Sequence, residues 1–307
     1  MSPRPGLKTT SAARRSFLAA AMVPPLGWLG GCATPLPLDE PPGSSVSDEG
    51  KALLRSAAEA HGLDAYRQLL DINVRYEGEW RPLVDRIQPI LVDKPYRGPS
   101  EERLIPAAGL VAQSYTGAAG RKQVVWKRGA ATTTTGADVS VWVNGQPSAN
   151  SEALSAAALV ADAYGLFLLG PIWLLGRVEA TQRAPSERVD GRVCEVVECW
   201  MRPGLGRAMI DRVSLCVDSA GWMRRVRFTL EGFSGTRGAV AQVDTFEHER
   251  RHGVVWPMRS YEEVVHPVRL PAHDWRIAGL DVDRGYDESA VNGPAFVGAA
   301  SRAASPL

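Results

Sequence analysis

Short segments in which apolar and polar residues alternate recur along the chain, and this pattern constrains the fold more than any other feature. Strands are expected at residues 72–77 (INVRYE), 139–143 (VSVWV), 226–231 (VRFTLE), 240–246, 254–265 and 275–282. Turn residues separate several of them, notably Asn144-Gly145 and the segment 218–221 (DSAG). Strands at this spacing predict an antiparallel meander that curves into a barrel or half-barrel.

Two regions have helical spacing instead. Asp48 is expected to cap a helix with one apolar face, which Gly62 ends, and a second short helix leads into the first strand. A longer apolar helix is expected over residues 154–175, with Ser151 as its cap and Asp162 as its only charge. Its internal charge and its breakers at Gly165, Gly170 and Pro171 favour a buried helix over a membrane span.

These elements predict a fold class that is mainly β (α+β). We expect a curved antiparallel half-barrel with N-terminal helices and the apolar helix against its concave face. An apolar helix must pack against another apolar surface, and the concave side of a bent sheet provides one.

The N-terminus has the layout of an export signal. The first 31 residues carry four basic residues and no acidic one, and an apolar run follows from Phe17 to Leu29. Residues 13–18 (ARRSFL) resemble the twin-arginine export motif, and residues 29–32 (LGGC) resemble a bacterial lipobox. The resemblance implies cleavage after residue 31 and acylation of Cys32, for example with palmitate, which would anchor the chain to a membrane. Ala33 favours the outer membrane over inner-membrane retention.

The remainder divides into a tether and one domain. Residues 32–47 are rich in Pro, Ser and Gly and predict a flexible tether, and residues 48–300 are expected to form the β domain. Without residues 1–31 the chain has 31 basic and 34 acidic residues. A nearly neutral, slightly acidic domain lacks the basic footprint of a nucleic-acid-binding protein.

The cysteines leave two interpretations open. With Cys32 acylated, Cys194, Cys199 and Cys216 remain, and a cross-strand disulfide between Cys199 and Cys216 is one possibility in an oxidising compartment. The alternative is three half-buried thiols that act as small apolar side chains. Folding in the reducing cytoplasm before twin-arginine export would favour the thiols.

The order of elements resembles the lipoprotein-carrier fold of the LolA and LolB types. Three segments carry this resemblance: residues 60–66 (AHGLDAY), 218–226 (DSAGWMRRV) and 253–257 (GVVWP). The resemblance covers roughly residues 48–297 and includes no catalytic motif. It implies an apolar cavity that takes acyl chains, although a fold alone does not establish an activity.

One motif suggests a different function. Residues 248–252 (HERRH) match the H-E-x-x-H pattern of zinc metallohydrolases, in which His248 and His252 would bind the metal and Glu249 would activate water. The pattern works only on a helix, where residues four apart share a face. The preceding residues 240–246 favour a strand and Gly253 follows at once, so a solvent-exposed hairpin turn is preferred.

A binding protein is therefore the favoured interpretation, without catalytic residues or a cofactor. Its partners would be a membrane, through the lipid anchor, a lipid or other apolar small molecule, and possibly another envelope protein. The residues expected to contact the ligand are Val141, Phe167, Leu168, Leu169, Trp173, Leu174, Val226, Phe228 and Leu230. A non-catalytic envelope scaffold, whose cavity is filled by its own side chains, is the remaining alternative.

Overall fold

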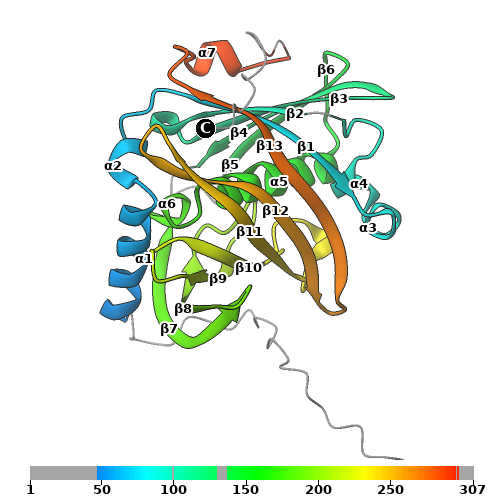
Figure 1. The fold of residues 1–307 in the computed structure, drawn as a ribbon. Helices are drawn as coiled ribbons and strands as arrows, with labels where there is room; N and C mark the ends of the chain where they lie inside the picture. Colours follow the sequence, from blue (N-terminus) through cyan, green and yellow to red (C-terminus); the bar gives the residue numbers. More distant parts are fainter. Residues whose placement is uncertain (1–46, 99, 130–136, 295, 297–307) are drawn as a thin grey trace, which may run out of the picture. The chain divides into compact units, whose positions relative to one another are not determined.

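The computed structural model describes residues 47–98, 100–129, 137–294 and 296 (Figure 1). The strands are β1 (Ile72–Trp80), β2 (Ser100–Ile105), β3 (Leu110–Gly117), β4 (Gly120–Arg128), β5 (Ala137–Val143), β6 (Gln146–Pro147), β7 (Val178–Val189), β8 (Arg192–Met201), β9 (Asp211–Val217), β10 (Met223–Thr229), β11 (Val240–Arg251), β12 (Val254–His266) and β13 (Leu270–Val282). The helices are α1 (Asp48–Ala60), α2 (Leu63–Tyr66), α3 (Pro82–Ile87), α4 (Pro89–Val92), α5 (Ser151–Leu169), α6 (Pro171–Leu174) and α7 (Glu288–Val291), with short 3₁₀ turns η1 (Pro106–Ala108) and η2 (Ser234–Thr236).

All strands belong to one 13-stranded antiparallel sheet, which confirms the predicted fold class. The strand order is β6-β5-β4-β3-β2-β1-β13-β12-β11-β10-β9-β8-β7. Strands that follow one another in sequence pair with each other, except β6 and β7, which lie at opposite edges of the sheet. The pairing of β1 with β13 joins the two halves. The predicted Asn144-Gly145 turn is confirmed, since both residues have positive φ angles, of 50° and 81°.

The helix α5 fills the concave side of this sheet. It contacts β3, β4 and β5 in one half and β12 in the other, and Figure 1 shows it enclosed between them. Asn150, rather than the predicted Ser151, caps it, because the Asn150 side chain accepts hydrogen bonds from the backbone N–H groups of residues 152 and 153. Gly170, with a φ of +52°, ends the helix, and Pro171 starts α6.

Among the described helices, only α5 has the length and apolar composition of a membrane span, and most of it is buried inside the domain. Its one buried charge, on Asp162, is neutralised within the core, while Glu152 in its first turn is exposed. The Asp162 carboxylate forms two hydrogen bonds with the Arg177 guanidinium, both 2.7 Å long. It also accepts hydrogen bonds from Trp173 Nε1 and from the Gly206 backbone, each at 2.8 Å. The buried Asp162 carboxylate therefore ties α5 to the segment that follows α6.

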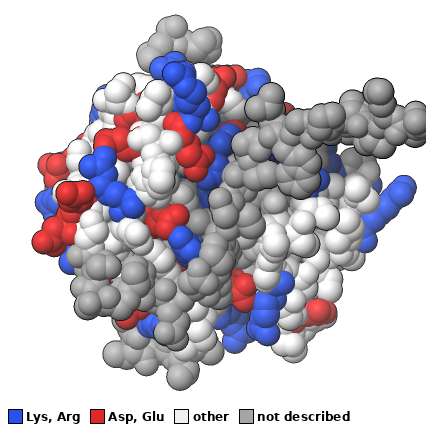
Figure 2. Space-filling view, turned by 90° about the horizontal axis from the view of Figure 1, so that it is seen from below, with Lys and Arg blue, Asp and Glu red and all other residues white. Residues whose placement is uncertain are grey.

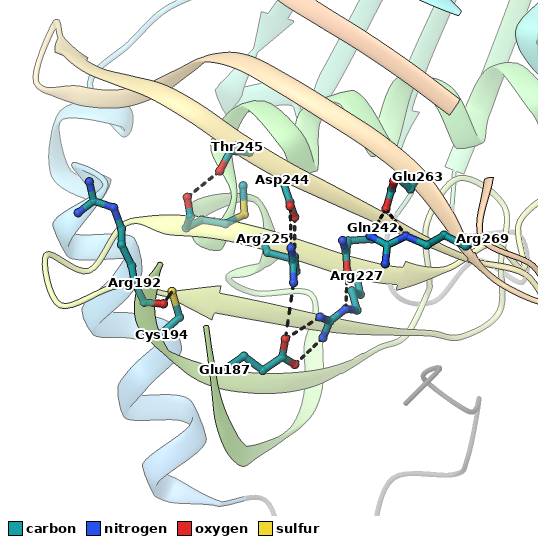
Figure 3. A network of polar contacts seen from close by, with 11 residues as sticks. Glu187, Arg192, Cys194, Arg225, Arg227, Gln242, Asp244, Thr245, Glu263 and Arg269 are labelled. Carbon is teal, nitrogen blue, oxygen red and sulfur yellow. Dashed lines mark hydrogen bonds and ion pairs between the residues drawn. The ribbon is translucent and has the colours of Figure 1, made fainter. Parts of the chain in front are cut away.

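Alternation along β10 separates two environments. Val226 and Phe228 are buried in the main core, whereas Arg225 and Arg227 point to the opposite face. There the Arg227 guanidinium donates two hydrogen bonds to Glu187, and Arg225 donates two to Asp244 (Figure 3). The outer face of this half of the sheet is thus held by ion pairs, and the inner face by apolar packing.

The N-terminal helices dock on the second half of the sheet. Ser47, rather than the predicted Asp48, caps α1 through a hydrogen bond from the Gly50 backbone. After α1, buried His61 accepts a hydrogen bond at Nε2 from the Met223 backbone N–H, at 2.9 Å. Gly62 has a φ of +94°, and a Cβ atom there would lie 2.1 Å from a backbone oxygen of the β11–β12 turn. The predicted stop at Gly62 is confirmed by this close approach.

Candidate functional site

An apolar pocket of about 340 Å³ lies between α5 and the second half of the sheet. The short helices α3 and α4, which follow β1, form one wall, and the β12–β13 hairpin forms another. The apolar lining residues are Trp80, Val84, Ile87, Leu91, Leu159, Val160, Ala163, Tyr164, Phe167, Phe228, Leu230, Ala239, Val264, Pro267, Val268, Leu270 and Ala272.

Aromatic rings line this pocket, and two further rings that do not line it, those of Trp275 and His273, pack against them. Phe167 on α5 packs against Phe228 of β10 and Trp275 of β13, with ring centroids 5.4 Å apart in both pairs. The His273 ring stacks on Trp80 and on Trp275, at 4.3 and 4.5 Å. Because rings packed on several sides have little freedom to collapse inward, these contacts keep the pocket wall in place.

The rim of the pocket exposes large apolar side chains to solvent. Ile87 at the end of α3 is 53% exposed, and Val268 in the β12–β13 turn is 63% exposed. Both line the pocket, so its apolar surface continues to the outside. An exposed apolar rim around an apolar pocket is typical of a site that receives an apolar ligand.

Polar side chains in the lining are few, and one of them is unpaired. Gln88 donates a hydrogen bond to the Gly235 carbonyl oxygen, and Thr236 donates one to the Leu230 carbonyl oxygen. The mostly exposed Arg237 lies 3.6 Å from a Glu231 oxygen. The side chain of Glu262 on β12 has no hydrogen bond or ion pair within the described residues, and burial raises the pKa of its carboxyl group to about 7.

A second, more polar pocket of about 290 Å³ adjoins the apolar one. Trp80 and Tyr164 line both pockets and separate them. Arg97 lines the second pocket and lies over the Tyr115 ring, with its guanidinium carbon 4.1 Å from the ring centroid. The site therefore combines an apolar chamber with an adjacent polar one across an aromatic partition.

Three of the nine predicted ligand-contacting residues line the apolar pocket, namely Phe167, Phe228 and Leu230. The other six are buried in the core and do not line this pocket: Val141, Leu168, Leu169, Trp173, Leu174 and Val226. Trp173, for example, packs against Gly165, where an added Cβ would lie 2.6 Å from its ring. Burial was thus predicted correctly, but burial alone does not distinguish residues that face empty space from residues that fill it.

The sequence analysis did not predict the pocket wall that α3 and α4 form. The two helices are six and four residues long, too short for a helical period to be recognised. A signal was present, since Pro82 and Pro89 each begin a helix and Ile87 and Leu91 lie four residues apart. Apolar residues in a region without strand alternation could have pointed to a covering element.

Of the two interpretations left open for the cysteines, the structure does not support the possible disulfide between Cys199 and Cys216. All three described cysteines are free thiols. In the β8–β9 ladder Cys199 lies opposite Val213, while Cys216 lies opposite Val196, so the two are not cross-strand partners. Cys199 belongs to the main core and Cys216 to a small cluster on the other face of the sheet. The alternative of apolar thiols is confirmed, although the thiols are fully rather than half buried.

The zinc-site interpretation of residues 248–252 is also wrong in its geometry. His248 lies in strand β11, where Nε2 is 2.9 Å from the Met223 carbonyl oxygen and Nδ1 is 2.9 Å from an Arg224 nitrogen. His252 lies in the β11–β12 turn with a φ of 51° and is exposed. Within the described ranges, no group of three or more His, Cys, Asp or Glu residues could hold a metal ion. The preferred hairpin is confirmed, but only His252 lies in its solvent-exposed turn, whereas His248 is half buried in β11.

The export signal, Cys32 and the tether lie outside the described residues and stay predictions. On the face shown in Figure 2, acidic and basic side chains are interspersed rather than gathered by sign. The absence of a nucleic-acid partner stays a prediction.

Comparisons with known proteins show a similarity of fold only. No protein-family model matches the chain, and no curated protein matches its sequence. The structure is similar to that of a DUF1329 family protein from Desulfovibrio piger, with a TM-score of 0.51 and 12% identity over 80% of this chain and 98% of that one.

Two further solved structures are similar over comparable lengths. A LolA superfamily protein from Nitrosomonas europaea has a TM-score of 0.47 and 14% identity over 79% of this chain and 97% of that one. A putative outer membrane lipoprotein-sorting protein domain from Vibrio parahaemolyticus has a TM-score of 0.40 and 11% identity, over 79% and 97%. The curved sheet wrapped around an apolar helix confirms the predicted half-barrel with the helix against its concave face. The fold and the pocket define a class: a half-barrel domain with an apolar pocket on its concave side.

Proposed function

We propose that this chain is an envelope lipoprotein that binds an acyl chain or another apolar ligand in the pocket between α5 and the β12–β13 hairpin. The observation that carries the proposal is the apolar lining of a pocket of about 340 Å³ with an apolar rim. Ligand pockets commonly measure about 300–1,000 Å³. Each buried methylene contributes about 0.8 kcal/mol, so an alkyl chain binds without any catalytic group.

The test is ligand binding by the purified full chain. Native mass spectrometry is expected to show co-purified lipid, and an uncharged fluorophore such as N-phenyl-1-naphthylamine is expected to bind after lipid removal. Ala163 lines the pocket, so Ala163→Phe should fill part of it and weaken binding at least about tenfold. Ala153 lies on the same helix outside the pocket, and Ala153→Phe is the matched control.

Two outcomes would contradict the proposal. One is a wild-type protein that carries no lipid and binds no fluorophore, which would favour an envelope scaffold. The other is equal binding by wild type and a folded Ala163→Phe variant, which would place the ligand elsewhere. Circular dichroism of both variants separates loss of binding from loss of folding.

Membrane attachment through Cys32 is part of the proposal. Radioactive palmitate is expected to label the wild-type chain in bacterial cells and not a Cys32→Ser variant, because the thiol of residue 32 would carry the acyl groups. Fractionation is expected to place the labelled chain in the outer membrane. Replacing the paired Arg14 and Arg15 by Lys should block export if the twin-arginine route is used.

A further inference from the structure

The unpaired carboxyl group of Glu262 is unusual in an otherwise apolar pocket. The other polar side chains of the lining, Gln88, Thr236 and Arg237, each have a partner within the described residues. Glu262 has none there, and its side chain is partly exposed. The space that it contacts is the pocket itself. Its carboxyl oxygens are therefore available to whatever enters.

The surroundings of Glu262 provide no compensating charge. On the sheet it lies directly opposite Val243 of β11 and His273 of β13. Burial holds the pKa of His273 well below its ordinary value, so this ring is neutral near pH 7. Tyr164 approaches from α5, and its hydroxyl group is 3.4 Å from His273 Nδ1. Arg237 on the rim is the one cation of the lining within the described part of the chain, and it lies near Glu231.

The unpaired carboxyl group of Glu262 affects which ligands the pocket can bind. An unpartnered carboxyl group that loses water on ligand entry costs free energy unless the ligand offers a hydrogen bond. A hydroxyl, amide or ammonium group can donate to the carboxylate, and an ammonium group also neutralises it. The carboxylate of a free fatty acid has no proton to donate, and two nearby carboxylates repel each other.

On the basis of the proposed apolar-ligand function, we propose that Glu262 is a specificity-determining residue, which selects amphiphiles with a hydroxyl or amine donor and disfavours free fatty acids. The alkyl chain packs against Phe167, Phe228 and the α3–α4 wall. The donor group binds the Glu262 carboxyl oxygens.

The test uses three ligands that share a twelve-carbon chain. Dodecylamine, 1-dodecanol and dodecanoate each compete at pH 8 with N-phenyl-1-naphthylamine on the purified full chain. The amine and the alcohol are expected to displace the fluorophore at concentrations at least about tenfold lower than dodecanoate. Glu262→Gln should weaken dodecylamine about tenfold and strengthen dodecanoate by a similar factor.

Glu263→Gln is the matched control. Glu263 is the next residue of β12, but its side chain pairs with Arg269, at 2.6 Å (Figure 3). It does not line the pocket. This variant is expected to leave the order of the three ligands unchanged.

Two results would overturn the inference, and they differ from a failure of the proposed function. The first is dodecanoate binding as tightly as dodecylamine to the wild type. The second is an unchanged ligand order in Glu262→Gln. Either result would mean that the pocket binds apolar ligands but that Glu262 does not select among them. If the fluorophore itself does not bind the wild type, both the inference and the proposed function fail.

Discussion

Asp162 on α5 and Arg177 after α6 form a two-bond ion pair in the protein core, with side chains 0% and 6% exposed. Removing one partner of such a pair leaves an uncompensated buried charge, which costs roughly 3–5 kcal/mol. We expect Asp162→Ala to lower the free energy of unfolding by that amount in urea titrations. Arg55→Ala, which breaks an exposed pair with Glu59, should cost less than about 1 kcal/mol. Equal losses in the two variants would contradict this account.

Buried His61 is expected to make the domain sensitive to acid. Burial lowers the pKa of His61 to about 3, whereas its ordinary value is 6.5. Below pH 6.5 the unfolded chain binds a proton that the folded chain does not, so stability is present above that pH and is lost as the pH falls toward 3.

A His61→Leu variant tests this expectation. At pH 7 it should lose roughly 1–3 kcal/mol of unfolding free energy, because the Met223 backbone N–H loses its acceptor. Its stability should also fall less than that of the wild type between pH 6.5 and 4. His252→Asn, at an exposed position, is the control. Identical pH profiles for wild type and His61→Leu would contradict the expectation.

Glu262 should make the folded domain less stable as the pH rises, which is the opposite of the effect of His61. Its folded pKa of about 7 lies above the ordinary value of 4.5. The unfolded chain therefore releases its proton first as the pH rises, and stability falls between pH 4.5 and 7. Glu262→Gln is expected to be more stable than the wild type by roughly 1–3 kcal/mol at pH 8 and no more stable at pH 4. Urea unfolding of the ligand-free chain at both pH values measures this; a wild type more stable than the variant at pH 8 would refute it.

The buried cysteines should be inert in the folded protein. Burial raises the pKa of Cys216 to about 12 and raises that of Cys199 further, so little thiolate forms at neutral pH. A thiol reagent is expected to leave Cys194, Cys199 and Cys216 unmodified in native buffer and to modify all three in guanidinium chloride without a reductant. An intact mass two daltons below that of the reduced chain would instead reveal a disulfide.

The sequence predicted the architecture because the alternation of apolar and polar residues is a local property of each strand. Val226 and Phe228 alternate with Arg225 and Arg227, and the structure places them on opposite faces as expected. The sequence could not decide whether Cys199 and Cys216 are partners, for a different reason. The register between β8 and β9 depends on the irregular segment between residues 201 and 211, and a shift along the ladder changes which residues face each other.

The pocket could be predicted only in part for a related reason. Phe167 and Leu169 are equally apolar and both buried, yet only Phe167 faces the pocket. Which of them does so depends on where α3 and α4 leave space. That space results from long-range packing, which residue patterns within one segment do not encode. Glu262 was missed because a charged residue in an alternating strand is usually solvated.

The pairing of β1 with β13 bears on the order of events during synthesis. The partner of the first strand leaves the ribosome about 190 residues later, roughly 10–40 s at ordinary translation rates. Throughout that interval one edge of β1 has no partner, and the apolar helix lacks the second half of its enclosure. The domain therefore cannot close before β13 has been made, and the unpaired edge of β1 is open to aggregation until that strand arrives.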